Sequence, residues 1–291
     1  MSDVALRRRT ARTTAARAAE ASEPTPTVAP VPARTSLVRR LGRVVTAVGL
    51  RSVAILAFLA LWEVAPRVGV VDRVFLPPFS EVLATTWELI RNGQLPQHVA
   101  ASLQRAGTGF GIAVATAIPL GLLIGWYRPV AIVLNPILEA FRNTAALALL
   151  PVFVLILGIG ETSKIALVVF AAFFPILLNT ISGVRTVDPL LIRSARSLGL
   201  SSPRLFQKVI LPAAVPTIFT GLRMAGAASV LVLIAAEMIG AQAGLGYLVN
   251  AAQLNFQIPQ MYAGILAISV IGIAVNAALL AAERHFSRWR A

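Results

Sequence analysis

The chain has 291 residues, of which 57% are hydrophobic, and its mean hydropathy of +0.79 is too high for a soluble domain of this size. It contains no cysteine and only two histidines, which excludes disulfides and thiolate metal sites and argues against a histidine-based metal centre. The net charge of +14 comes from arginines at the ends of apolar runs, so we assign it to membrane topology and not to nucleic acid binding. The composition predicts an all-α polytopic membrane protein.

Residues 1–45 are rich in Ala, Thr, Pro and Arg and are predicted to form a disordered, basic cytoplasmic tail. A basic start before an apolar run is also typical of a signal peptide. Here, however, the run begins too late and no small-residue cleavage site follows it. The tail arginines can attract anionic lipid headgroups, although fixing the orientation of the chain is their simpler role. Residues 46–291 then form one transmembrane domain.

Crossing the hydrocarbon layer takes about twenty apolar residues. By this criterion we predict six spans, at Val53–Val71, Ala106–Trp126, Val130–Leu157, Ser163–Ile181, Ala213–Ile239 and Tyr262–Ala282. Glu63, Pro66 and Arg67 interrupt the far end of the first, so five spans remain an alternative. With a cytoplasmic N-terminus, six spans place 72–104 outside and both the basic segment 183–212 and the C-terminal arginines (Arg284, Arg288 and Arg290) inside.

Two pairs of glycines lie on roughly one face of the second span. They are Gly107 with Gly111 and Gly121 with Gly125, each spaced four residues apart. This spacing is typical of helices whose backbones approach closely in a membrane. We therefore expect this face to pack against another helix.

The third span carries the most polar group of residues predicted to lie inside the membrane. Glu139, Arg142, Asn143 and Thr144 are near its midpoint, where a charge costs a few kcal/mol, so they are expected to face a cavity or one another. A guanidinium matches the oxygens of nitrate or a sulfonate, which makes Arg142 a candidate station for an anion. A structural Glu139–Arg142 pair on one helical face explains the same residues equally well.

Two further polar residues are candidates for the translocation pathway. Asn179 lies near the cytoplasmic end of its span, where it can line an inner gate or cap a neighbouring helix. Glu237 follows Ala213 by 24 residues, roughly 36 Å along a helix, which places it at the outer interface. It can belong to an outer gate or a binding-protein contact, or simply be exposed to interfacial water.

The basic segment between the fourth and fifth spans has the signals of two short helices. Asp188 is a good N-cap for a helix over Pro189–Leu198, and Gly199 stands at the expected C′ position. A second helix starts at Ser202 and is closed by Pro212. Together they predict a compact basic knob that docks in a partner's groove. An ordinary cytoplasmic loop would carry the same charge.

The same segment resembles the cytoplasmic EAA loop of ABC-importer permeases, which reads Glu-Ala-Ala, three residues, Gly, nine residues, Ile, one residue, Leu-Pro. The frame falls on Arg193, Ser194, Ala195, Gly199, Val209, Leu211 and Pro212. With Asp188, Pro189 and Arg196, these residues are the expected ATPase-coupling loop. Arg193 replaces the family's Glu and Ser194 its first Ala, which reverses the sign of the first contact.

From about Leu76 to Trp289 the chain is similar to the permeases that import nitrate, aliphatic sulfonates, taurine and related small anions. The matching strings are Leu76-Pro-Pro-Phe-Ser-Glu-Val-Leu83, Pro175-Ile-Leu-Leu-Asn-Thr180, Ala195-Arg-Ser-Leu-Gly199, Ala236-Glu-Met-Ile-Gly-Ala241 and Gly244-Leu-Gly-Tyr-Leu248. Members of this family tend to carry a proline-rich break after an arginine in the third span. This chain reads Arg142-Asn-Thr-Ala-Ala146 there, so the break is left open.

The resemblance implies a type I ABC-importer permease fold in a bacterial cytoplasmic (inner) membrane. The chain would be a transport subunit and not an enzyme, and it would carry no cofactor or metal of its own. ATP and Mg²⁺ would be bound by two ABC ATPase subunits beneath the coupling loops. The other implied partners are a second permease copy, forming a homodimer, and an external substrate-binding protein.

Rival functions lack their usual signals in the sequence. No Gly-Lys-Ser/Thr phosphate loop is present, so the chain cannot bind ATP by that route. A secondary transporter usually shows acidic groups at mid-membrane and two halves that echo each other, whereas only Glu139 is central here and no repeat is evident. A channel needs only a polar lining and, with the secondary transporter, remains the alternative.

Overall fold

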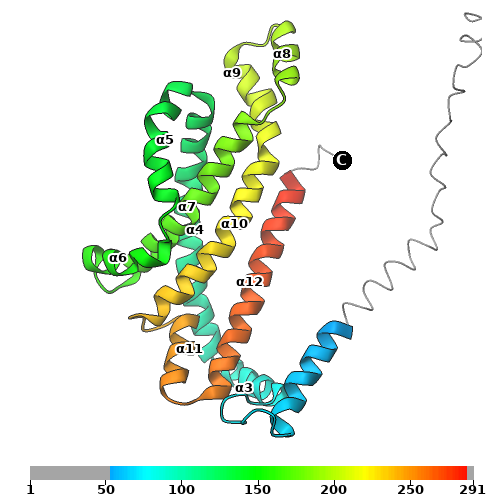
Figure 1. Ribbon diagram of the computed structural model, residues 1–291, viewed down its shortest axis with the longest axis vertical. Helices are drawn as coiled ribbons and strands as arrows, with labels where there is room; N and C mark the ends of the chain where they lie inside the picture. Colours follow the sequence, from blue (N-terminus) through cyan, green and yellow to red (C-terminus); the bar gives the residue numbers. More distant parts are fainter. Residues whose placement is uncertain (1–52, 287–291) are drawn as a thin grey trace, which may run out of the picture. The chain divides into compact units, whose positions relative to one another are not determined.

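The computed structural model describes residues 53–286, and within this range every regular element is a helix (Figure 1). The predicted tail over 1–45, with Arg288 and Arg290, lies outside the described residues. The first described helix covers 53–67. The later elements are α3 (Phe79–Arg91), α4 (Gln94–Trp126), α5 (Arg128–Arg142), the 3-10 helix η1 (Ala146–Leu149), α6 (Leu150–Leu157), α7 (Glu161–Arg185), α8 (Pro189–Ser197), α9 (Ser202–Leu205), the π-helix η2 (Phe206–Ile210), α10 (Leu211–Met238), α11 (Leu245–Leu254) and α12 (Ile258–Phe286).

Among residues 53–286, four helices are long and apolar enough to cross a membrane: α4, α7, the continuous helix Ser202–Met238 and α12. They confirm the second, fourth, fifth and sixth predicted spans. The third predicted span is divided into α5 and the segment Ala146–Leu157, which meet at a bend of 85° and form a span only as a pair. The first predicted span is helical over 53–67, about 22 Å at 1.5 Å per residue, and is not one of these spans.

The break in the third span is present although Arg142-Asn-Thr-Ala-Ala146 contains no proline. Its polar side chains supply a reason. The Asn143 Nδ2 atom donates to the carbonyl oxygen of Glu139 at 2.9 Å, and the Thr144 hydroxyl donates to that of Ala140 at 3.2 Å. Side chains that bond the preceding turn compete with continuation of the helix.

The spanning helices alternate in direction between two ends (Figure 1). The helices α8 and α9 lie at one end, which we call the knob end, and α3 and α11 lie at the opposite end, which we call the α11 end. The helix α12 runs from the α11 end to the knob end. This arrangement agrees with the prediction that 72–104 and 183–212 are on opposite sides of the membrane.

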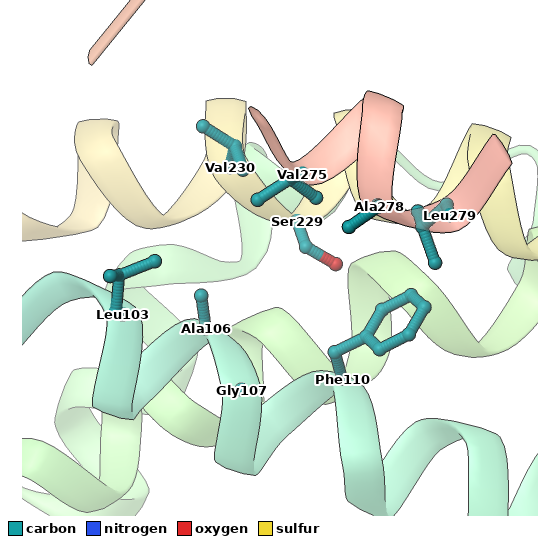
Figure 2. Close-up of a pocket in the computed structure, with 10 residues that line it drawn as sticks. Leu103, Ala106, Gly107, Phe110, Ser229, Val230, Val275, Ala278 and Leu279 are labelled. Carbon is teal, nitrogen blue, oxygen red and sulfur yellow. The ribbon is translucent and has the colours of Figure 1, made fainter. Parts of the chain in front are cut away.

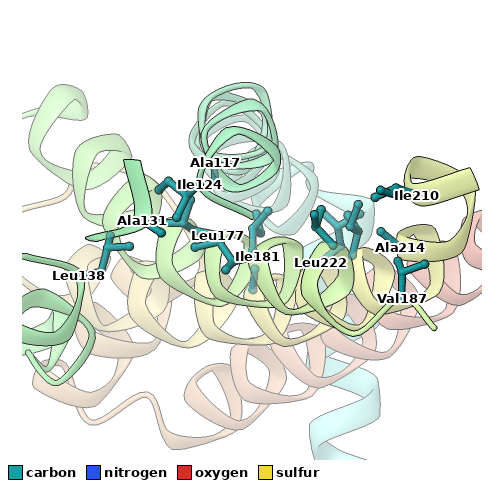
Figure 3. Packing of buried hydrophobic residues seen from close by; sticks show 14 of the residues in the cluster. Ala117, Ile124, Ala131, Leu138, Leu177, Ile181, Val187, Ile210, Ala214 and Leu222 are labelled. Carbon is teal, nitrogen blue, oxygen red and sulfur yellow. The ribbon is translucent and has the colours of Figure 1, made fainter. Parts of the chain in front are cut away.

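The core is formed by α7 packed along both α4 and α10 (Figure 3). Its side chains are aliphatic, and Ile124 of α4 and Leu177 of α7 are completely buried in it. Lipid tails are as apolar as these side chains, so close packing and not water exclusion must hold such helices together in a membrane.

Small residues set the approach of α4 to α7. A Cβ atom added at Gly121 or Gly125 would lie 2.7 Å or 2.8 Å from the nearest side-chain atom of α7, so the predicted close packing is confirmed there. It is wrong for Gly107 and Gly111, where an added Cβ has nothing within 4 Å. At that level α4 turns another face to α7, and Gly109 makes the close contact.

The packing of α12 is looser. A cavity of about 210 Å³ separates it from α4 and α10 (Figure 2). The cavity is lined by Leu103, Ala106, Gly107, Phe110, Gly226, Ser229, Val230, Val275, Ala278 and Leu279. Within α12 only Ala263 and Gly264, near the α11 end, are buried. Toward the knob end an ion pair of 3.1 Å between Arg223 and Glu283 holds α12 to α10.

Candidate functional site

The basic segment forms a knob whose first helix follows the sequence signals. The Asp188 Oδ1 atom accepts the backbone N–H of Leu190 at 2.7 Å and so caps α8. Gly199 has a φ of 78°, the left-handed conformation that ends a helix. Its N–H donates to the carbonyl oxygen of Arg196 at 2.9 Å. The helix ends at Ser197, one residue earlier than predicted.

The second helix of the knob begins at Ser202 as predicted, but the prediction that Pro212 closes it is wrong. The helix continues through η2 into α10 without interruption, from Ser202 to Met238. A proline inside a helix lacks an N–H, and its ring clashes with the carbonyl four residues earlier. The wider π turn directly before Pro212 relieves both problems. The knob is therefore one piece with a spanning helix.

The residues of the coupling frame divide into an anchored and an exposed set. Ala195 is buried and joins Leu205 and Ile210 in the core, which seats α8 on the base of the knob. The other anchored members are half-buried: Val209, Leu211 and Pro212. The exposed members are Asp188, Pro189, Arg193, Ser194, Arg196 and Gly199. Beside them Leu190, Leu191 and Leu198 are 64%, 53% and 81% exposed, and a group of large exposed apolar side chains among basic ones is typical of a partner contact.

The predicted polar group of the third span lies where α5 ends at the 85° bend. The Arg142 Nε atom is 3.3 Å from Glu139 Oε2, so the predicted pair is present, and both side chains are exposed in this chain. Asn143 and Thr144 bond to the preceding turn of their own helix. The four residues are thus together at an interrupted span, with the guanidinium open to a ligand or to another chain.

An aromatic groove lies beside this bend. Phe141, adjacent to Arg142, stacks on Phe174 with ring centroids 6.3 Å apart. The groove has a volume of about 590 Å³ and is also lined by Ile112, Phe153, Thr162, Ile165, Ala166, Val169, Phe170 and Phe173. The groove is lined mainly by apolar side chains, one of which, Phe141, directly precedes Arg142 in the chain.

Asn179 is half-buried in α7 and neither caps a neighbouring helix nor lies in the knob. Its Nδ2 atom donates to the carbonyl oxygen of Pro175, one turn earlier, at 2.8 Å. Its Cβ faces Gly221 of α10, where an added Cβ would come within 2.6 Å. The side chain thus contributes to the packing of α7 on α10.

Glu237 lies in the last turn of α10, close to its predicted place, but it is not exposed to water. Its side chain is completely buried. The carboxylate accepts hydrogen bonds from the Ser102 hydroxyl at 2.8 Å, from Arg105 Nη1 at 2.7 Å and from the backbone N–H of Gly246 at 3.0 Å. A charge without solvent is tolerated only with such complete pairing. The expectation of simple exposure is wrong.

Arg105 extends this pairing to α7. Its guanidinium forms a two-bond ion pair with Glu161 at the start of that helix, with Nη2 2.7 Å from Oε1. It also donates to the carbonyl oxygen of Ala243 at 2.6 Å. Lys164, likewise buried, donates to the carbonyl oxygens of Gly160 and Gly240 at 3.0 Å and 3.2 Å. Two cations thus balance two carboxylates.

The start of α11 is fixed by the same side chains. Its first N–H, that of Leu245, donates to the Ser102 hydroxyl at 2.9 Å, and the next donates to Glu237. The N–H of Gly244 donates to His98 Nδ1 at 3.1 Å. Free N–H groups and the positive end of the helix dipole both favour a carboxylate at this point. We call Ser102, Arg105, Glu161, Lys164 and Glu237 the polar cluster.

Sequence reasoning identified only Glu237 of the polar cluster. Arg105 directly precedes the second predicted span, Glu161 precedes the fourth and Lys164 is the second residue of the fourth, and charged residues are ordinary at the ends of spans. The available signal was the strings Ala236-Glu-Met-Ile-Gly-Ala241 and Gly244-Leu-Gly-Tyr-Leu248. Together they contain the carboxylate, the loop and the helix start that the cluster joins.

Comparison with known sequences finds relatives along most of the chain. Residues 117–291 match the family model described as "Binding-protein-dependent transport system inner membrane component". A probable ABC transporter permease protein of Brucella abortus is 36% identical, over 84% of this chain and 97% of the relative. The putative aliphatic sulfonates transport permease protein SsuC of Bacillus subtilis is 35% identical, over 80% and 84%. The taurine transport system permease protein TauC of Escherichia coli is 36% identical, over 79% and 86%.

Solved structures share the fold. A chain of the MetNI methionine ABC transporter, in an inward-facing conformation, superposes with a TM-score of 0.56 and covers 69% of this chain and 96% of its own length. A chain of an amino acid ABC transporter gives a TM-score of 0.52. The sequence identities are 20% and 19%, so these two likenesses concern the fold alone.

Proposed function

This chain belongs to the family of binding-protein-dependent transport system inner membrane components, and from that premise we propose that it imports a small organic anion. As a member of the family it is a permease subunit of an ABC importer, a multi-pass membrane protein and not itself an enzyme. It works with an ATPase and a substrate-binding protein. These partners set aside the secondary transporter and the channel.

The knob is the proposed seat of the ATPase. It supplies a capped helix, an exposed Leu198 and exposed basic side chains outside the bundle. In this proposal two ATPase subunits bind ATP and Mg²⁺ beneath two permease copies, and this chain holds no cofactor. Arg193, at the position of the family's Glu, requires a matching acidic contact on the ATPase. The knob end, the N-terminus and the C-terminus then lie in the cytoplasm.

The proposed substrate class comes from the relatives. Those that transport aliphatic sulfonates or taurine are 35% and 36% identical to this chain, whereas a formylaminopyrimidine permease of Halalkalibacterium halodurans is 29% identical. An aliphatic sulfonate carries three oxygens on its sulfur atom, at the end of an apolar tail. Of the anions considered, including nitrate, it suits best a guanidinium with an apolar surface beside it.

Arg142 with the adjoining aromatic groove is the proposed station for this anion. The side chain sits at an interrupted span, and irregular backbone at membrane depth belongs beside a cavity and not against lipid. Arg142 would pair with the sulfonate oxygens, and the groove containing Phe141 and Phe174 would receive the tail. Asn143 and Thr144 would add polar contacts, and Glu139 would release Arg142 to the ligand.

In the proposed cycle, ATP binding closes the two ATPases and the knob follows them. The spanning helices then swing from inward-facing to outward-facing and accept substrate from the binding protein, and ATP hydrolysis resets them. In each step this chain only moves and binds substrate transiently. The chain therefore needs no catalytic side chain of its own.

The knob, continuous with a spanning helix, is the observation that carries the proposal. Its test is affinity purification of this chain from native membranes in mild detergent, with identification of the co-purifying proteins. We expect a cytosolic ATPase of the ABC class, lost when Gly199→Val distorts the knob. The binding protein encoded with it is then screened for sulfonates, taurine and nitrate. Recovery of the folded chain without any ATPase contradicts the proposal.

A further inference from the structure

We infer that Glu237 is a positioning residue for transport, through which movement of the knob is passed to the opposite end of the bundle. The inference rests on the proposed function, because it concerns how the ATPase-driven step reaches the side where substrate enters. It adds that α4, α7, α10 and α11 move as one body, joined at the α11 end by the polar cluster.

The first observation is the continuity of one helix. Ser202–Met238 has 37 residues, about 55 Å at 1.5 Å per residue, and the knob and Glu237 are at its two ends. The helix is continuous through Pro212, which follows the π turn of η2, and through Pro216 in the next turn, so a displacement can pass along its axis. A displacement at the knob is therefore delivered at Glu237.

The second observation is what Glu237 holds. Through its three donors the carboxylate is joined to α4 and to the start of α11, and through Arg105 it is joined further to Glu161 of α7. The Glu237 side chain has no solvent contact. Sliding of α10 alone would take the buried Glu237 carboxylate away from its three donors, which is strongly unfavourable. The four helices are thus obliged to move together.

The third observation is that α12 contributes no residue to the polar cluster and packs more loosely than α7, although its Leu279 contacts α10 at Gly226. The cavity lies between it and α4 and α10, and its buried residues are confined to its start (Figure 2). Its ion pair with Arg223 is partly exposed, with Glu283 20% and Arg223 34% exposed. By contrast α4 and α7 are in contact at the small residues Gly109, Gly121 and Gly125. Glu283→Gln is accordingly the matched control: the same change, in an interhelical ion pair that joins α12 to α10 outside the polar cluster.

The experiment uses the complete importer of permease, ATPase and binding protein in proteoliposomes. For Glu237→Gln we expect assembly and basal ATP hydrolysis within twofold of wild type. Uptake, and the stimulation of hydrolysis by loaded binding protein, should each fall at least tenfold. In Glu283→Gln, assembly, basal hydrolysis, uptake and stimulation by the binding protein should all stay within twofold of wild type. Wild-type uptake by Glu237→Gln overturns the inference, and so does an equal loss in Glu283→Gln. Failure of the wild-type importer to couple hydrolysis to uptake instead overturns the proposed function.

A spin-label measurement separates transmission from a structural role. Because the chain has no cysteine, Gln207→Cys on the knob, outside the residues assigned to the ATPase contact, and Leu254→Cys on α11 can be labelled one at a time. Both positions are exposed. We expect ATP to change the distance between the two permease copies at both positions in wild type, and only at the knob in Glu237→Gln. Movement of both ends in the variant contradicts the inference.

A milder variant covers the case in which Glu237→Gln does not assemble. Ser102→Ala removes one hydroxyl that bridges Glu237 and the first N–H of α11, and leaves both charges paired. We expect assembly and unchanged basal hydrolysis, with binding-protein stimulation reduced about threefold to tenfold. If loaded binding protein stimulates ATP hydrolysis of Ser102→Ala as much as that of wild type, the inference is contradicted. Full activity of Glu237→Gln would contradict it equally.

Discussion

Removing the Arg105 side chain should destabilise the chain more than removing the side chain of Glu237. In Arg105→Met the Glu237 carboxylate stays buried with only the Ser102 hydroxyl and one backbone N–H as donors. Breaking a buried pair in this way costs about 3–5 kcal/mol. In Glu237→Leu the guanidinium keeps Glu161 and the carbonyl of Ala243, so only about 1–3 kcal/mol is lost.

The double variant Arg105→Met/Glu237→Leu gives the sharper expectation. Neither buried charge is left alone, while Glu161, whose side chain is 63% exposed, is hydrated. The double variant should therefore be more stable than Arg105→Met by itself, with a coupling energy of about 1–3 kcal/mol. Arg142→Met, in an exposed ion pair, is the control and should cost less than about 1 kcal/mol.

The assay is reversible unfolding of the purified chain in mixed micelles with an increasing fraction of sodium dodecyl sulfate. Tryptophan fluorescence and far-UV circular dichroism report the transition, and the four tryptophans remain in every variant. If Arg105→Met unfolds at the wild-type detergent fraction, or if the double variant loses the full sum of the single losses, the pair is not energetically coupled and the reasoning from burial is refuted.

Other predictions concern packing, the knob and the anion station. Gly121→Ala brings a Cβ to 2.7 Å from an α7 side chain and should cost about 1–3 kcal/mol in the same unfolding assay. Gly111→Ala has free space and should stabilise the chain by about 0.5–1 kcal/mol. Equal effects of the two substitutions would contradict the packing argument. Gly199→Val places a β-branched residue at a φ of 78°, which should cost about 1–2 kcal/mol locally. The variant should insert in the membrane but lose its association with the ATPase. Normal uptake by this variant would count against the knob as the ATPase contact. Arg142→Ala should abolish uptake while basal ATP hydrolysis of the complex persists, and surviving uptake would leave the Glu139–Arg142 pair without a role in transport.

Local signals predicted those features that depend on neighbours in the chain. The knob's first helix follows from Asp188 and Gly199, because capping and the left-handed turn involve residues only a few positions apart. The error at Pro212 has the same origin. A proline usually ends a helix, and nothing in its immediate neighbourhood reveals that the preceding turn widens to accept it.

Pairings between distant residues were beyond local signals. Arg105 and Glu237 are 132 positions apart, and each alone looks like an ordinary charge at the end of a span. The same holds for the glycines of α4: their spacing predicts a packing face, but the positions of the neighbouring helices decide that Gly109 makes the close contact with α7 and that Gly107 lines a cavity.

The sequence by itself therefore determined the class of protein, the apolar runs that cross the membrane, the basic knob and the family frame within it. These are properties of composition and short-range order. Only the tertiary structure decided that Glu237 is buried and paired, that the knob is continuous with a spanning helix, and that α12 packs loosely. The physical reason is that burial belongs to the packed assembly of helices: whether a charge meets water, lipid or a counter-charge depends on residues far away in the chain.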